Sequence, residues 1–311
     1  MNTIQSLKNK IILITGITGF VGSHLAKKLL SSGAVVFGTS RTHRSKNTFK
    51  LSVLNRSALS KLLKKLNVSI CIHLGGVSIV QTGQTSPYHT FKTNIQGTLN
   101  ILECCRQNGL EKVIIPSTSH VYGNNTVPYL EDYPPKPSRP YETSKTATDI
   151  ISQSYAETFD LPVFIPRFVN IYGPGDLNFE RLIPKTIKNA LLDRPPTMWG
   201  GKVKRSFLYI DDAIDAYIKL ASLKPQLGTN RIFNFGTGEV ITIEALIKKI
   251  IKLSSKKLVI KRIEEGREHE IPSQYVSWKK AKRILKWEPK VSLNAGLKKT
   301  IHWYRKFLAV S

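Results

Sequence analysis

The sequence predicts an α/β fold built on a doubly wound parallel sheet, with a smaller α/β region towards the C-terminus. The first observation is a series of short, continuous apolar segments, which is the pattern of parallel strands buried on both faces. The second is that segments with helical periodicity separate them, as the crossovers of a parallel sheet require. The third is a glycine-rich turn at residues 16–22, between the first apolar segment and the first helix. With 311 residues, 41% of them hydrophobic, the chain can bury such a core.

The same two patterns alternate along the first half of the chain. The apolar segment 10–15 predicts a strand, and the periodicity of 20–30 predicts a helix that ends near Gly33. Further strands are predicted at 34–39, 68–74, 112–116 and 162–167, and further helices at 57–66, 90–108 (ended by Gly109) and 139–159.

The first domain is therefore expected to span residues 1–167. After it the periodicity becomes irregular, with Gly/Pro-rich segments such as 194–201. Residues 168–311 are expected to form the smaller region, from which the chain crosses back to the first domain near 205–230. Ligands of doubly wound sheets bind outside the carboxyl ends of the strands, so this region is expected to hold the substrate there.

The glycine turn has the spacing of a dinucleotide-binding, Rossmann-type turn. Gly16 permits a tight turn, Gly19 lets the backbone approach a pyrophosphate, and Gly22 allows close packing of the helix. Phe20 and Val21 stand in the first turn of that helix, whose N-terminus faces the phosphates. We expect all five residues to contact the dinucleotide.

The end of the second strand indicates which dinucleotide is bound. NAD sites usually offer a carboxylate there, but residues 39–44 contain no acid. Ser40 is small, and Arg41 and Arg44 are cations that suit a 2′-phosphate. We therefore favour NADP(H). NAD(H) remains possible if Arg41 stacks on the adenine or faces solvent.

Composition excludes several other classes of protein. The net charge of +26 comes from lysines scattered in pairs, without aromatic–basic interleaving, so no nucleic-acid partner is expected. No apolar segment approaches the length of a membrane span, and no signal peptide is apparent. Cys71, Cys104 and Cys105 have neither zinc spacing nor a disulfide pattern. We expect a cytoplasmic protein without metal or membrane contacts.

Tyr141 and Lys145 stand four residues apart, on one face of the helix predicted at 139–159. There the ammonium is expected to lower the pKa of the phenol, so that Tyr141 acts as a base. Thr118 directly follows a predicted buried strand, where its hydroxyl can orient a substrate alcohol. Together these residues suit removal of a carbinol proton while hydride passes to a nicotinamide, with Lys145 also holding the ribose.

With these motifs the chain resembles the extended short-chain dehydrogenases/reductases, the NAD(P)-dependent nucleotide-sugar epimerase/dehydratase family. Residues 175–184 and 274–277 are most similar to the branch of CDP-glucose-type 4,6-dehydratases. The resemblance covers almost the whole chain and includes the motifs at 73–76, 93–98, 167–175, 205–212 and 285–289.

The resemblance implies further site residues and a homodimer. Leu74 and Gly75 are expected at the cofactor. The helices at 90–108 and 139–159 are expected to form the dimer seam. The residues expected at the sugar nucleotide are Asn94, Ser119, Asn170, Arg181, Arg205 and Arg267.

Three reactions begin with chemistry at C4 of the hexose. A 4-epimerase needs only Thr118, Tyr141 and Lys145. A 4,6-dehydratase also needs an acid–base pair, which the family supplies after the threonine, whereas this chain has Ser119 and His120. His120 would then have to be the C5 base. An NADPH-dependent 4-ketoreductase is the third reaction. We favour the 4-epimerase, and a non-catalytic dinucleotide- or RNA-binding protein is the alternative of another class.

Overall fold

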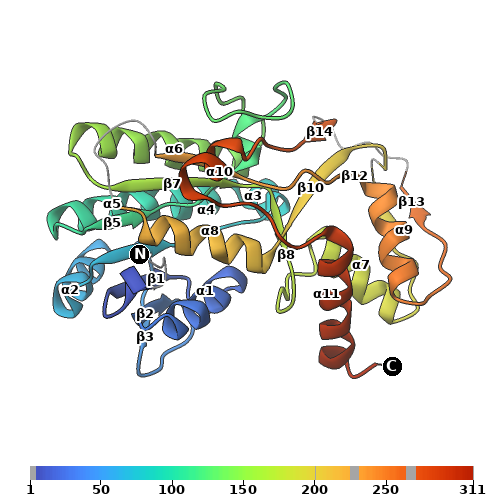
Figure 1. Cartoon of the computed structure of the whole chain (residues 1–311), viewed down its shortest axis with the longest axis horizontal. Helices are drawn as coiled ribbons and strands as arrows, with labels where there is room; N and C mark the ends of the chain where they lie inside the picture. Colours follow the sequence, from blue (N-terminus) through green and yellow to red (C-terminus); the bar gives the residue numbers. More distant parts are fainter. Residues whose placement is uncertain (1–4, 200, 225–230, 264–270, 311) are drawn as a thin grey trace.

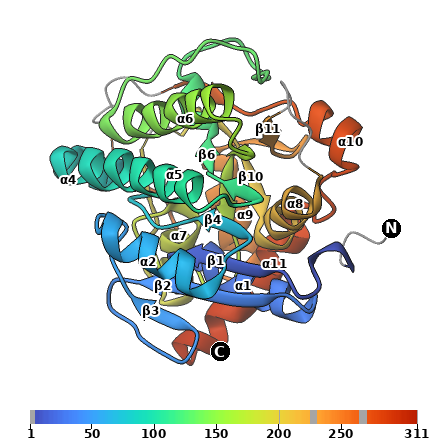
Figure 2. The same cartoon turned by 90° about the vertical axis from the view of Figure 1, so that its left-hand side faces the viewer.

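The computed structural model describes residues 5–199, 201–224, 231–263 and 271–310. Within them, helices cover both faces of a central sheet (Figures 1 and 2). Its strands are β1 (Ile11–Thr15), β2 (Val35–Ser40), β3 (Thr48–Lys50), β4 (Ile70–His73), β5 (Lys112–Ile114), β6 (Ser117–Thr118), β7 (Val163–Phe168) and β11 (Ile232–Phe235). Their order is β11-β7-β5-β4-β1-β2-β3 with β6 beside β7, and every pairing is parallel. The predicted doubly wound parallel sheet is confirmed.

The strands are apolar throughout because their side chains alternate between two cores. In β1, Ile12 and Ile14 belong to one core and Leu13 to the other, and in β4 Ile72 and Cys71 divide in the same way. The first core lies under α1 (Phe20–Ser31) and α8 (Ile210–Ser222). The second lies under α2 (Arg56–Leu66), α5 (Gly97–Gln107) and α6 (Pro140–Thr158).

A smaller group of elements follows β7, on the right of Figure 1. Its helices are α7 (Leu182–Leu191), α9 (Ile243–Leu253) and α11 (Leu293–Leu308), whereas α10 (Lys279–Leu285) packs against β11 of the central sheet. Its strands are β8 (Asn170–Tyr172), β9 (Thr197–Met198), β10 (Lys204–Tyr209), β12 (Val240–Thr242), β13 (Lys261–Arg262) and β14 (Ser273–Gln274). β8, β12 and β14 each pair with β10, and β9 pairs with β13. From β10 the chain runs into α8 and then into β11, which lies beside β7.

One expected helix is interrupted. The sequence predicts a single helix over 90–108, but the structure has α4 (Pro87–Phe91), a π-helical turn at Lys92–Gln96, and then α5. The side chain of Asn94, in this turn, accepts from Val77 N at 2.8 Å and donates to Ser144 Oγ at 2.9 Å. A π turn is a common way to re-aim a residue at a functional position. Periodicity alone does not reveal this turn. Other short helices are η1 (Gln5–Leu7), α3 (Val80–Thr85) and η3 (Ser119–Tyr122).

Three expectations concern features of the whole chain. None of the described helices is long and apolar enough to cross a membrane. Cys71, Cys104 and Cys105 are free and buried. Across the described residues, no group of three or more His, Cys, Asp or Glu side chains is placed to hold a metal ion.

Candidate active site

A cavity of ≈ 1120 Å³ runs from the glycine turn to the smaller region. Its walls carry most of the residues singled out from the sequence. These are Gly16, Gly19, Phe20, Val21, Gly22, Ser40, Arg41, Leu74, Gly75, Asn94, Thr118, His120, Tyr141, Lys145, Asn170, Arg181 and Arg205. Arg44 is exposed and Ser119 is buried, and neither lines the cavity. Arg267 lies outside the described residues.

The glycine turn is packed so closely that side chains do not fit. A Cβ on Gly22 would lie 2.3 Å from the carbonyl oxygen of Gly16. Gly16 has φ +70°, and its Cβ would lie 3.0 Å from Gly75 N. Gly19 is the N-cap of α1 and provides no side-chain hydrogen bond. Gly19 therefore leaves the first N–H groups of α1 without a capping side chain. These groups border the cavity, where they can bind an anionic pyrophosphate.

The end of β2 forms the wall where the dinucleotide's second ribose is expected. Ser40, Arg41 and Thr42 line it, and no acid lies among the lining residues at 39–42 and 51–54. Ser40 Oγ lies 3.1 Å from Thr18 Oγ1 and accepts from His43 N at 3.2 Å. This turn leaves Arg41 as the cation that borders the cavity here. Of the two arginines expected there, Arg41 lines this wall of the cavity and Arg44 does not.

Thr118, Tyr141 and Lys145 come together at the middle of the cavity. Thr118 ends β6, and Tyr141 and Lys145 stand one turn apart in α6. Tyr141 is 9% exposed, and the hydroxyl of Thr118 is near enough to act on the pKa of its phenol. Lys145 Nζ donates to the carbonyl oxygen of Pro116 at 2.5 Å, which holds the ammonium beside β6.

The electrostatics of this set differ from the sequence-based expectation. We expected the ammonium of Lys145 to lower the pKa of Tyr141. Burial instead raises the pKa of Tyr141, and the opposing charge is that of Arg181, with a smaller effect from the bond to Thr118. Burial also lowers the pKa of Lys145 to about 8, against the raising effect of Asp149. Both groups are thus held nearer their neutral forms than in water.

Glu142 is a site residue that the sequence reasoning missed. It follows Tyr141 in α6, is 1% exposed, and its Oε1 lies 3.4 Å from His120 Nδ1. The His120 and Tyr141 rings meet edge to face, with centroids 6.2 Å apart. Burial works to raise the pKa of Glu142, but the hydrogen bond and charge of His120 and the bonds from Ser138 outweigh it and lower this pKa. Its place three residues into a helix is the signal that sequence could have used.

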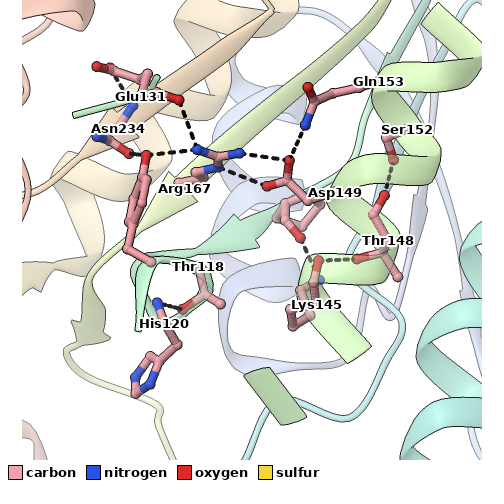
Figure 3. A network of polar contacts seen from close by, with 12 residues as sticks. Thr118, His120, Glu131, Lys145, Thr148, Asp149, Ser152, Gln153, Arg167 and Asn234 are labelled. Atoms are coloured by element: carbon pink, nitrogen blue, oxygen red, sulfur yellow. Dashed lines mark hydrogen bonds and ion pairs between the residues drawn. The ribbon is translucent and has the colours of Figure 1, made fainter. Parts of the chain in front are cut away.

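A buried ion pair fixes α6 to the sheet. Arg167 on β7 donates to Asp149 through Nε (2.8 Å) and Nη2 (2.9 Å), and Figure 3 shows the two side chains facing each other. Arg167 Nη1 donates to the Tyr122 hydroxyl at 2.8 Å, which in turn donates to Asn234 Oδ1 on β11. Asp149 lies one turn after Lys145, so this network holds the part of α6 that carries Tyr141 and Lys145. The residues of this network are polar, so the hydrophobic periodicity of the sequence would place them on the protein surface.

The end of the cavity in the smaller region carries two of the predicted arginines. Arg181, just before α7, binds Asp176 Oδ2 at 3.1 Å and Ser78 Oγ at 3.2 Å. Arg205 on β10 donates to the carbonyl oxygen of Ile271 at 2.8 Å. The amide of Asn94, by contrast, is engaged with Val77 and Ser144, so it holds the wall of the cavity rather than offering free polar atoms.

Comparison with known proteins decides the family. The model of the NAD dependent epimerase/dehydratase family matches residues 12–236. The chain belongs to this family. The epimerase/dehydratase relatives include the UDP-glucuronate 4-epimerase of Thermodesulfobacterium geofontis, which is 30% identical over 94% of this chain and 96% of that protein. They also include the UDP-N-acetyl-alpha-D-glucosaminuronate decarboxylase of Bacillus cytotoxicus, 33% identical over 96% and 98%.

A solved structure of the family superposes over nearly the full length. The UDP-glucuronic acid 4-epimerase of Bacillus cereus, in complex with UDP-glucuronic acid and NAD, matches with a TM-score of 0.88 and 28% identity. The match covers 96% of this chain and 99% of that one. The protein is therefore an NAD(P)-dependent enzyme of the nucleotide-sugar epimerase/dehydratase family, and the resemblance noted from the motifs is confirmed.

Proposed function

We propose that this enzyme epimerises C4 of a nucleoside-diphosphate hexose by reversible hydride transfer. The observation that carries the proposal is that Thr118, Tyr141 and Lys145 line one cavity, between the glycine turn and an arginine-bearing end in the smaller region. A 4-epimerase needs no other group at the reacting carbon. The similarity to two 4-epimerases supports the same reaction.

The cavity residues fit a dinucleotide. The turn that a Cβ on Gly22 would fill, and the N-terminus of α1, suit its pyrophosphate. A nicotinamide bound there would accept and return the hydride. Tyr141 takes the proton of the C4 hydroxyl, and Thr118 holds that oxygen in line with the phenol. Lys145, fixed by Pro116, offers its remaining N–H donors to a ribose hydroxyl.

The nicotinamide cofactor is proposed to be the phosphorylated form, NADP(H). The support is the acid-free wall at the end of β2, with Arg41 lining it. A ribose 2′-hydroxyl offers no charge for this guanidinium to meet, whereas a 2′-phosphate does. NAD remains the cofactor in the structure of the Bacillus cereus relative.

We also propose that the substrate diphosphate lies near Arg205 and that the enzyme works as a cytoplasmic homodimer. Apolar side chains remain exposed on the helices expected at the seam: Tyr88 on α4 is 76% exposed, and Ile150 and Phe159 on and after α6 are 52% and 49% exposed. A second copy would cover them. The reduced state of the cysteines fits a reducing compartment.

A 4,6-dehydratase is the second candidate. It is favoured by the contact between His120 and Glu142, because a dehydratase needs a base for C5 besides Tyr141. The two reactions give different products in solvent deuterium. A dehydratase incorporates deuterium at C5 and yields a 4-keto-6-deoxy sugar, whereas a 4-epimerase does neither.

The experiment is product analysis by NMR, with UDP-, dTDP-, CDP- and GDP-hexoses and UDP-hexuronates supplied to the enzyme and its cofactor. We expect one of these substrates to interconvert with its C4 epimer. A new methyl signal would show that the enzyme is a 4,6-dehydratase and not a 4-epimerase. No turnover of any nucleotide sugar would refute both.

A further inference from the structure

We infer that Glu142 is a positioning residue for His120, which it holds with Nδ1 protonated and Nε2 presented to the substrate as a proton acceptor. The inference rests on the proposed function for the identity of the substrate. It concerns a second proton-transfer group in the cavity, beside Tyr141. The geometry that supports it is that the two oxygens of Glu142 have different partners: Oε2 caps the helix and Oε1 faces His120.

One oxygen of Glu142 caps the catalytic helix. Oε2 accepts from Ser138 N and Ser138 Oγ, both at 3.1 Å, and from Arg139 N at 3.3 Å. Glu142 is the third residue of α6, so its carboxylate reaches back to the start of the helix, as in a capping box. Three donors saturate this oxygen. The capping role therefore leaves Oε1 for another partner.

The other oxygen of Glu142 faces His120. Oε1 lies 3.4 Å from Nδ1, and the carboxylate is buried where water does not compete. An ionised carboxylate has no proton to donate, so Nδ1 must carry the hydrogen of this contact. Neutral His120 is then the Nδ1–H tautomer, and Nε2 keeps its lone pair.

The free edge of His120 borders the cavity. Its side chain is 17% exposed, against 1% for Glu142, so the ring opens to the cavity on the side away from the carboxylate. In Figure 3 the imidazole points away from the Asp149–Arg167 pair. With the Tyr141 ring 6.2 Å away, both side chains meet the same sugar ring. If Tyr141 takes the proton at the C4 oxygen, His120 is the group left to accept a proton from a neighbouring position of the sugar.

Glu142→Gln tests the inference because the amide has only one acceptor. The donors of Ser138 and Arg139 fix the amide oxygen at the Oε2 position, so the NH₂ group must face His120. An NH₂ group donates, which requires Nδ1 to be unprotonated. The substitution therefore keeps the helix cap but inverts the tautomer of His120. Ser138→Ala is the matched control, because it removes one capping bond and leaves the contact between Glu142 and His120.

The first readout is ¹⁵N NMR of the enzyme labelled in its histidine rings, at a pH where the rings are neutral. His120→Ala identifies the His120 signals among those of the seven histidines. We expect the Nδ1–H pattern in the wild type and in Ser138→Ala, and the Nε2–H pattern in Glu142→Gln. A wild-type ring in the Nε2–H form, or a ring unchanged by Glu142→Gln, would overturn the inference.

The second readout is turnover of the nucleotide sugar. We expect Glu142→Gln to lower kcat only moderately, with little change in KM, because Tyr141 still takes the C4 proton, and Ser138→Ala to stay near the wild type. Equal losses in both variants, or an inverted ring with wild-type turnover, would also overturn the inference. A wild type that turns over no nucleotide sugar refutes the proposed function instead. The NMR result still decides what Glu142 does.

Discussion

The buried pair of Asp149 and Arg167 offers a quantitative test of how α6, the helix of Tyr141 and Lys145, is held against the sheet. The side chains are 1% and 3% exposed, and two bonds of 2.8 and 2.9 Å join them. Arg167→Met would leave the carboxylate with the amide of Gln153, 2.8 Å away, as its side-chain partner. An ion left in this position without its counter-ion costs about 3–5 kcal/mol. That is a large fraction of the roughly 5–15 kcal/mol that stabilises a domain.

The double variant separates loss of the pair from loss of packing. Asp149→Leu should cost a similar amount, because Arg167 then keeps only Tyr122 and the carbonyl oxygen of Glu131. Asp149→Leu with Arg167→Met removes both charges, so its cost should fall well below the sum of the two single costs. Urea unfolding, followed by tryptophan fluorescence, gives the free energy of unfolding of the wild type, the two single variants and the double variant. Single variants that each lose less than about 1 kcal/mol, or costs that simply add, would refute the reasoning.

Four further predictions concern the cavity. Tyr141→Phe should lower turnover at least 100-fold with dinucleotide affinity unchanged, because only the phenol oxygen is lost; near-wild-type turnover would exclude this residue as the base. Arg41→Ala should weaken NADP(H) binding about tenfold or more by calorimetry, since a charge-assisted hydrogen bond is worth about 1.5–3 kcal/mol; an equal loss for NAD(H) would remove the case for a 2′-phosphate. Gly22→Ala should abolish dinucleotide binding, because its Cβ meets the carbonyl oxygen of Gly16 at 2.3 Å, and unchanged affinity would contradict that packing. Between pH 8 and 10.5, Lys145 keeps its proton in the unfolded chain but has released it in the folded protein, so the free energy of unfolding should rise with pH, by about 3 kcal/mol from this residue. Lys145→Met should lose this increase in denaturant unfolding. An unaltered pH dependence would show that the fold does not lower the pKa of Lys145.

The sequence predicted the sheet and the centre of the site because both depend on short-range patterns. Continuous apolar segments mark strands covered on both faces, and β1, β4 and β7 were placed to within a few residues. The spacing of Tyr141 and Lys145 follows from the helical repeat alone. The glycine turn was equally accessible, because the close approach of Gly22 to the carbonyl oxygen of Gly16 lies within the turn itself.

What the sequence did not predict depends on contacts between distant residues. The sign of the Tyr141 pKa shift is set by burial, against the opposing charge of Arg181, which reaches the site from the smaller region. Glu142 meets His120 from another element, and Arg167 meets Asp149 across the sheet and helix layers. The interruption of the helix at Asn94 follows from its bonds to Val77 and Ser144. No window of sequence contains these partners together.

The return of the chain to the sheet has a consequence for its synthesis. β7 is complete at Phe168, yet β11, which pairs with it, begins only at Ile232. While the ribosome makes the intervening residues, β7 presents an open edge whose six residues are all buried in the finished protein. Such an edge invites pairing with other chains. Translation that stalls between these two strands should therefore yield an aggregating fragment, and chaperone capture is most needed during that interval.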